Sequence, residues 1–102
     1  MLRIYAIALE VMRRVRPFIE IIEAKDRDLG RQMRKAGASV VLNIAEGSGS
    51  SGGTRRERYR NALGSAREFR GCGDVACAFG YVECIPMEGL PEVIGSLVRL
   101  TR

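Results

Sequence analysis

The chain has 102 residues, with 17 Lys and Arg against 12 Asp and Glu, for a net charge of +5 at pH 7. That length holds a single domain, 1–102, because it leaves no room for a second core. Histidine is absent. This removes the commonest general base and metal ligand, so we expect neither an enzyme nor a metal or other cofactor. The basic excess suits phosphate backbones or acidic protein surfaces.

Three cysteines, Cys72, Cys77 and Cys84, form no C-x-x-C pair. An odd number without that spacing argues against a disulfide framework or a zinc site, and favours small apolar side chains in a reducing compartment. Arginines interrupt residues 1–24, which are therefore no secretory signal. No apolar run approaches the ~20 residues that cross a bilayer. We expect a cytoplasmic protein without a membrane partner.

Residues 2–24 carry apolar side chains at three- and four-residue steps, which is typical of an amphipathic helix. Pro17 lies inside this pattern. Proline removes one backbone hydrogen bond and clashes with the preceding turn, so it predicts either a kink or a break into two helices. The apolar stripe keeps its phase through Pro17, which favours the kink.

A second helix is predicted over 29–45, with Asp26 or Asp28 as its N-cap. Besides its main apolar face it carries a second apolar strip. That strip consists of Ala38, Leu42 and Ala45. Either several neighbouring helices bury it or it forms a subunit interface. A short bundle buries little surface by itself, which favours the interface.

Residues 47–53, GSGSSGG, read as a loop, because they contain nothing to bury. Thr54 and Glu57 have capping-box spacing, which predicts a third helix over about 55–80. Gly71 and Gly73 each weaken that helix by about 1 kcal/mol relative to alanine, so its middle should be distorted. The loop does not qualify as a phosphate-binding Walker motif, because a helix precedes it and no lysine follows.

Residues 81–89 read as a loop, and Pro91 suits the first turn of a short fourth helix. No segment alternates polar and apolar residues as a strand would. The fold predicted is therefore all-α: an up-and-down antiparallel four-helix bundle in which helix one is kinked at Pro17 and helix four is short.

Asn43 and Glu46 lie three residues apart, on one side of the second helix. Functionally, they would be a polar pair that faces a groove or subunit boundary and binds a ligand. Structurally, they would hydrogen-bond the backbone ends of neighbouring helices. The residues favour the structural interpretation without excluding the other.

Between Arg55 and Arg70 there are six arginines and only two glutamates. Arginine forks match phosphate oxygens, so this helix is a candidate nucleic-acid contact. The alternative is an ordinary solvated face. Tyr59 has core spacing and is not expected to stack on bases. The candidate contact residues, on helices one and three, are Arg13, Arg14, Arg55, Arg56, Arg58, Arg60 and Arg67.

Residues 32–36 (QMRKA) and 39–49 (SVVLNIAEGSG) resemble the four-helix-bundle family of 23S rRNA intervening sequence proteins. The likeness continues in 62–65 (ALGS) and covers about 29–82. Residues 71–77, GCGDVAC, depart from the family pattern of stronger helix formers. The motif that carries the resemblance comprises Asn43, Glu46, Gly47, Ser48, Gly64 and Ser65.

The resemblance implies a bacterial bundle that assembles into a homo-oligomer, a cyclic pentamer, and has no established activity in most members. A related branch partners a reverse transcriptase and nucleic acid, and some members are encoded within 23S rRNA genes. We therefore expect self-association, with RNA or DNA, a reverse transcriptase or a ribosomal component as further partners. Two functions remain open: a nucleic-acid-associated scaffold, and a protein-interaction scaffold without a nucleic-acid role.

Overall fold

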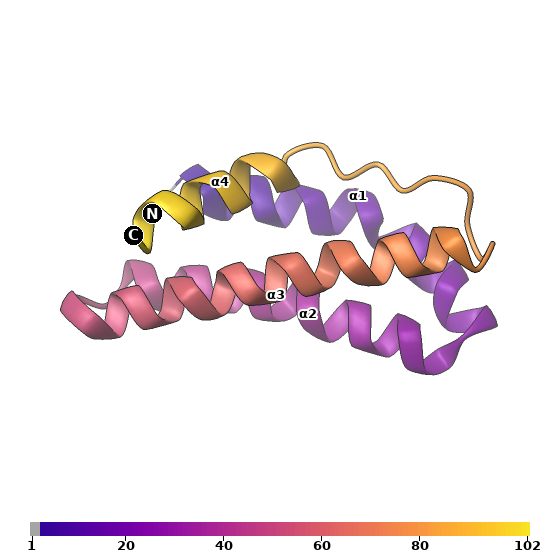
Figure 1. Cartoon of the computed structure of the whole chain (residues 1–102), viewed down its shortest axis with the longest axis horizontal. Coiled ribbons are helices and arrows are strands. Elements are labelled where there is room, and N and C mark those ends of the chain that lie inside the picture. Colours follow the sequence, from indigo (N-terminus) through magenta and orange to yellow (C-terminus); the bar gives the residue numbers. More distant parts are fainter. Residues whose placement is uncertain (1–2) are drawn as a thin grey trace.

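Four α-helices make up most of the computed structural model, which describes residues 3–102. In chain order they are α1 (Arg3–Lys25), α2 (Arg27–Ser48), α3 (Gly52–Ala78) and α4 (Leu90–Leu100). Successive helices run in opposite directions (Figure 1), and residues 3–102 contain no strand. The predicted all-α bundle with a short last helix is confirmed.

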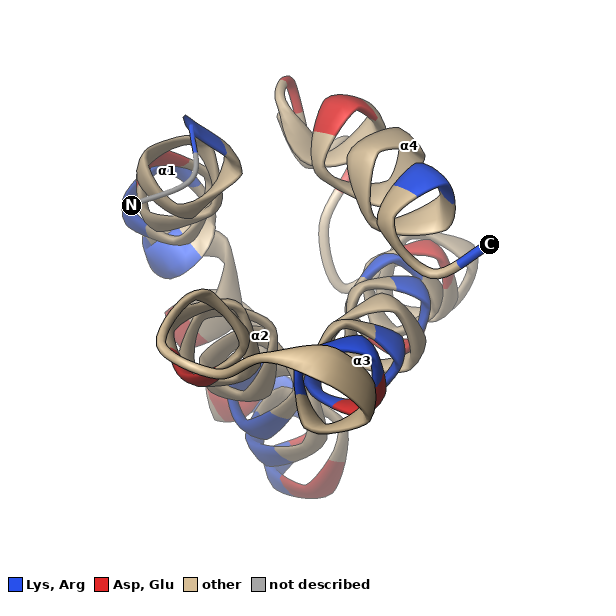
Figure 2. Cartoon of the chain, turned by 90° about the vertical axis from the view of Figure 1, so that its left-hand side faces the viewer, with Lys and Arg blue, Asp and Glu red and all other residues tan. Residues whose placement is uncertain are grey.

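The helices surround one core in the order of the chain. The α2–α3 contact is the most extensive, α1 packs on α2, and α4 contacts both α3 and α1. Helices α1 and α3 occupy diagonally opposite corners of the bundle (Figure 2). Side chains on these two helices therefore face different sides of the molecule unless they point into the core.

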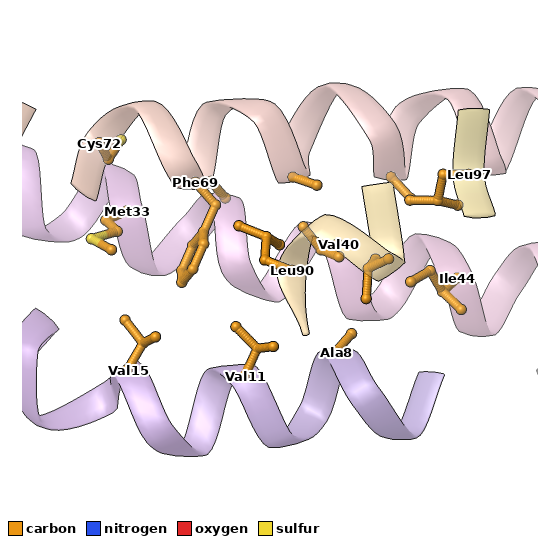
Figure 3. Close-up of a cluster of buried hydrophobic side chains, with 14 of the residues drawn as sticks. Ala8, Val11, Val15, Met33, Val40, Ile44, Phe69, Cys72, Leu90 and Leu97 are labelled. Carbon is orange, nitrogen blue, oxygen red and sulfur yellow. The ribbon is translucent and has the colours of Figure 1, made fainter. Parts of the chain in front are cut away.

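The core is built from the apolar stripes that the sequence predicts. Val11 and Val15 of α1 point towards Met33 of α2 and Phe69 of α3 (Figure 3). Tyr59 is buried, as predicted. Within residues 3–102 no polar or charged residue is buried. The buried hydrophobic residues are Ile4, Ala8, Val11, Val15, Ile19, Ile22, Met33, Ala36, Val40, Ile44, Tyr59, Ala62, Ala66, Phe69, Cys72, Ala76, Leu90, Val93 and Leu97.

Helix α1 is a single helix that continues through Pro17. The alternative of two separate helices is therefore not realised, and the kink stays a prediction. Pro17 is exposed, while Val15 and Ile19 on either side of it are buried. The unbroken apolar stripe keeps the helix on the core despite the one backbone hydrogen bond that proline cannot make.

The glycine- and serine-rich turn is shorter than predicted, because α2 extends to Ser48 and α3 begins at Gly52. The predicted capping box at Thr54 is wrong: Ser51 is the N-cap residue, and its side chain makes no capping hydrogen bond. Carbonyl groups of the turn, and not the N–H groups at the start of α3, have a side-chain partner here. Arg55 Nε donates to the carbonyl oxygens of Ser50, at 2.8 Å, and of Gly47, at 3.2 Å.

Helix α3 continues without a break through Gly71 and Gly73, and the distortion expected there stays a prediction. Gly73 is buried, and a Cβ on it would lie 2.5 Å from Met87 Cε and 3.4 Å from Ile85 Cδ1. The loop after α3 therefore packs directly on the helix backbone at this glycine. Burial of these side chains offsets the weak helix propensity of the segment.

The α1–α2 turn and the loop after α3 meet at Asp26, at the other end of the bundle (Figure 1). Its Oδ1 accepts from the backbone N–H of Leu29 at 3.1 Å, which confirms Asp26 as the N-cap of α2. Its Oδ2 accepts from the Tyr81 hydroxyl at 3.0 Å. Lys25 Nζ donates to the Tyr81 carbonyl at 2.9 Å. One carboxylate thus fixes both the α1–α2 turn and the start of the loop to α4.

Helix α4 begins after Gly89, whose φ of +97° is a conformation that favours glycine. Pro91 lies in the first turn, as predicted. A Cβ at residue 89 would also come within 2.9 Å of the Ile7 side chain. The loop can therefore pass closely over α1 before α4 enters the bundle.

Candidate nucleic-acid interface

Asn43 is tied to its own helix and, through one serine, to α3. Its Nδ2 donates to the Ser39 carbonyl at 2.9 Å and to Ser39 Oγ at 3.0 Å. Ser39 Oγ in turn lies 2.7 Å from Ser65 Oγ. Asn43 therefore does not cap a neighbouring helix, as the structural interpretation supposed. It lies more than a turn before the end of α2, beside the flank of α3, where serine hydroxyls are the available partners.

Glu46 also contacts a helix flank. Its Oε2 lies 3.1 Å from Arg58 Nε, across the α2–α3 turn. Both side chains are substantially exposed, so the pair adds little to stability by itself. Glu46 and Asn43 therefore both lie at the contact between α2 and α3.

The remaining motif residues divide between packing and exposure. Gly47 is buried against the ring of Tyr59, and Ser48 Oγ donates to the Ile44 carbonyl at 2.9 Å. Ser65 makes the contact with Ser39. Gly64 is exposed, and a Cβ there would meet nothing within 4 Å in this chain. Most residues of the motif therefore lie at the contact between α2 and α3, and Gly64 lies outside that contact.

Five of the seven predicted contact arginines are engaged within the chain. Arg13 pairs with Glu10 at 3.2 Å, and Arg14 donates to the Glu88 carbonyl at 2.7 Å. Arg55 and Arg58, near the start of α3, contact the Ser50 carbonyl and the Glu46 carboxylate. Arg56 donates to the carbonyl of Arg102, which places the C-terminal residue beside the start of α3.

Arg60 and Arg67 are exposed and make no ion pair with any acidic residue of 3–102. They lie seven residues apart, and Arg56 precedes Arg60 by one turn, so all three share a helix face. We call Arg56, Arg60 and Arg67 the α3 arginine row. It extends over about 16 Å, at 1.5 Å per residue. Along a duplex axis that length covers roughly five phosphates of one strand.

The α1 arginines do not join this row within one chain. Arg14 lies between α1 and the loop that carries Glu88, and Arg13 lines a groove between α1 and α2. Figure 2 shows that α1 and α3 stand on opposite corners. A nucleic acid contacted by both sets would have to bridge separate copies or wrap around the bundle.

A groove between α1 and α2 was not predicted. It has a volume of about 460 Å³, and its floor is apolar. Only its α2 side could be seen in the sequence, in the apolar strip that includes Ala38 and Leu42. The α1 side depends on Leu9, which lies outside the main apolar stripe. The α1–α2 groove is lined by Leu9, Met12, Arg13, Arg16, Ile19, Arg34, Gly37, Ala38, Val41 and Leu42.

A second depression, of about 430 Å³, lies between α2 and α3 and is polar. Arg31 and Lys35 approach it from α2, and Glu68 from α3. The carboxylate of Glu68 accepts from Gln32 Nε2 at 3.1 Å. Opposite charges share this surface, so it offers no concentrated binding site for an anion.

The ionisable groups with displaced pKa values are structural. The Arg34 guanidinium donates twice to the Glu23 carboxylate, at 2.8 and 2.9 Å, and lowers the pKa of Glu23. Burial raises the pKa of the Cys72 thiol. Over residues 3–102 there is no group of three His, Cys, Asp or Glu side chains placed to hold a metal ion. No helix in this range is long and apolar enough to cross a membrane.

Comparison with known proteins gives one informative match. The family model described as 23S rRNA-intervening sequence protein matches residues 1–100. Neither the curated proteins nor the solved structures contain a significant match to the chain. The match covers all four helices, including the divergent segment late in α3. The chain belongs to the 23S rRNA-intervening sequence protein family.

Proposed function

We propose that this protein is a non-enzymatic, self-associating scaffold that binds nucleic acid through the α3 arginine row. The row carries the proposal, because Arg60 and Arg67 are cationic, exposed and uncommitted to acidic residues of 3–102. The planar guanidinium of arginine presents donors that match phosphate oxygens, and less conformational freedom is lost for each hydrogen bond than with lysine. The family description names 23S rRNA, which favours RNA as the ligand.

The proposal that the protein is not an enzyme rests on the character of its interior and surface. Residues 3–102 bury no polar or charged side chain. A catalytic group needs a desolvated or charge-coupled setting to reach a useful pKa, and the polar depression between α2 and α3 is open and mixed in charge. The three free cysteines suit action in a reducing cytoplasm.

Removing the charge of Arg60 and Arg67 tests the row. Wild-type protein and the Arg60→Gln, Arg67→Gln double variant would be titrated with a short fluorescent single-stranded RNA at several salt concentrations. Each phosphate contact contributes about −0.7 to the slope of log K against log salt concentration. The double variant should therefore bind more weakly, with a slope shallower by about 1.4 for each chain engaged.

The matched control is the Arg27→Gln, Lys35→Gln double variant, which loses the same charge from exposed positions of α2. It should keep most of the wild-type affinity. If both double variants weaken binding equally, only net charge is involved and the row is not the site. If wild-type protein does not bind RNA at low salt, the nucleic-acid role is wrong. A duplex DNA of the same sequence would show whether RNA is preferred.

The second candidate is a protein-interaction scaffold without a nucleic-acid role, and the α1–α2 groove favours it. Leu42 is 60% exposed on this apolar surface, which is unusual for a side chain of its size. A second copy of the chain is the first occupant to consider, as in the homopentamer that the family resemblance implies. A reverse transcriptase or a ribosomal component would be a further partner of the assembled form.

A further inference from the structure

The α1–α2 groove is an open apolar surface on one side of the bundle. Leu42 and Ala38 of α2 face it from one side, and Leu9 and Met12 of α1 from the other. Gly37 keeps its floor low, because a Cβ there would lie only 2.8 Å from Met12 Sδ. Such a groove, about 460 Å³ in volume, has the form that accepts the ridge of another helix.

A complementary ridge lies on the solvent face of α3. Val75 and Phe79 are 40% and 66% exposed, and they are one turn apart. The ring of Phe79 is held in a T-shaped contact with Tyr81, with centroids 5.8 Å apart. The Phe79 ring therefore packs against Tyr81 outside the core and stays largely exposed.

The same face of α3 continues towards the N-terminus of the helix as a line of acidic and small residues. Glu57, Gly64, Glu68 and Gly71 precede Val75 at spacings of seven, four, three and four residues, which keeps them on one side of the helix. We call Glu57, Gly64, Glu68, Gly71, Val75 and Phe79 the outer stripe of α3. It is about 33 Å long. The α3 arginine row flanks it on the α4 side.

The charges of the two surfaces are opposite. Arg13 and Arg16 stand at the rim of the groove, and Glu57 and Glu68 lie in the outer stripe. Within the chain, Arg13 pairs with Glu10 and Arg16 with Glu20, at 3.2 and 4.0 Å. Those pairs are exposed and weak, so exchanging partners costs little.

The two surfaces cannot meet within one molecule, because the groove lies between α1 and α2 while the outer stripe faces solvent on α3. We propose that the outer stripe of α3 from one copy docks in the α1–α2 groove of the next copy. This inference rests on the self-association in the proposed function and adds its geometry. The contact is head-to-tail, so each copy keeps one free surface of each kind until a ring closes. The α3 arginine row is left beside the contact, not within it.

Two charge-introducing variants test the pairing. Leu42→Glu disables the groove and Phe79→Glu disables the outer stripe, and both change exposed side chains, so the bundle should fold normally. By light scattering at micromolar concentration, wild-type protein should have the mass of several chains and each variant the mass of one. An equimolar mixture should recover a two-chain complex, because one intact groove and one intact stripe remain to pair.

Leu100→Glu is the matched control, because Leu100 is 43% exposed on α4 and lies outside both surfaces. It should assemble as wild type does, and circular dichroism would verify that all variants are folded. If wild-type protein assembles but the mixture stays at one-chain mass, or if only Leu42→Glu disrupts assembly, the head-to-tail pairing is wrong while self-association stands. A one-chain mass for wild type would overturn both.

Discussion

The ring of Tyr59 lies against the backbone of Gly47, so that a Cβ on residue 47 would be 2.3 Å from Tyr59 Cε1. This contact joins the last turn of α2 to the first turns of α3. Because Tyr59 is 3% exposed and packed in the core, it cannot simply rotate away. The glycine of the family motif is therefore a packing requirement.

Gly47→Ala should destabilise the fold by about 1–3 kcal/mol, the usual cost of overpacking a tight contact. Gly64→Ala is the matched control, since a Cβ there meets nothing within 4 Å. It should leave the chain unchanged or stabilise it by up to about 1 kcal/mol. Urea unfolding monitored by circular dichroism measures both. Equal free energies of unfolding for the two variants would show that the Gly47–Tyr59 contact does not limit the residue at position 47.

The fold could be predicted from the sequence where apolar residues recur at helical spacing over many residues. The stripes of α1 and α2 specify which faces pack together, and Asp26 and Pro91 mark helix starts through local chemistry. The prediction made the loop at 47–53 too long at its start, because glycine-rich composition indicates flexibility but does not reveal that Tyr59 packs over Gly47. Loop composition cannot report a contact made by a residue twelve positions away.

The candidate site was harder to predict than the fold. Sequence shows where arginines are, but not that Arg58 pairs with Glu46 or that Arg14 reaches the Glu88 carbonyl. Both contacts depend on how helices pack, so spacing along one helix cannot reveal them. For the same reason the α1 side of the groove was missed, since Leu9 joins Leu42 only after α1 packs on α2.

The cysteines should differ in reactivity. Cys72 is buried, and burial raises the pKa of its thiol, whereas Cys84 is exposed in the loop before α4. Since the thiolate is the reactive form, an aromatic disulfide reagent should modify Cys84 quickly and Cys72 slowly. Cys84→Ser should remove the fastest phase. A fast phase that instead disappears in Cys72→Ser would mean that this part of α3 is open in solution.

The Glu23–Arg34 pair should contribute to stability in a defined pH range. Its twofold hydrogen bond lowers the pKa of Glu23 below its ordinary value of 4.5. The contribution is therefore full above pH 4.5 and is lost as the pH falls through the pKa of the folded protein. Arg34→Gln should raise the Glu23 pKa, measured by NMR titration of its side-chain carboxyl carbon. An unchanged pKa in this variant would show that the pair does not persist in solution.

The Tyr81–Asp26 hydrogen bond predicts a contribution to stability that is lost as the pH rises, whereas that of Glu23–Arg34 is lost as the pH falls. The hydroxyl donates to Asp26 Oδ2 at 3.0 Å, and this bond to a carboxylate raises the pKa of Tyr81 above 10.0. Because the protonated phenol makes the bond, its contribution to stability is present below pH 10 and is lost as the pH rises through the raised pKa of the folded protein. Ultraviolet titration of the tyrosines should show one group that ionises late.

Asp26→Asn separates this effect from helix capping. Asparagine keeps an oxygen that can accept from the Leu29 N–H, so α2 should retain its cap. The negative charge beside the phenol is gone, and the Tyr81 pKa should therefore return towards its ordinary value. Tyr81→Phe should remove the late-ionising group from the titration altogether. If that group persists in Tyr81→Phe, it belongs to another tyrosine, and the loop is not anchored at Asp26 in solution.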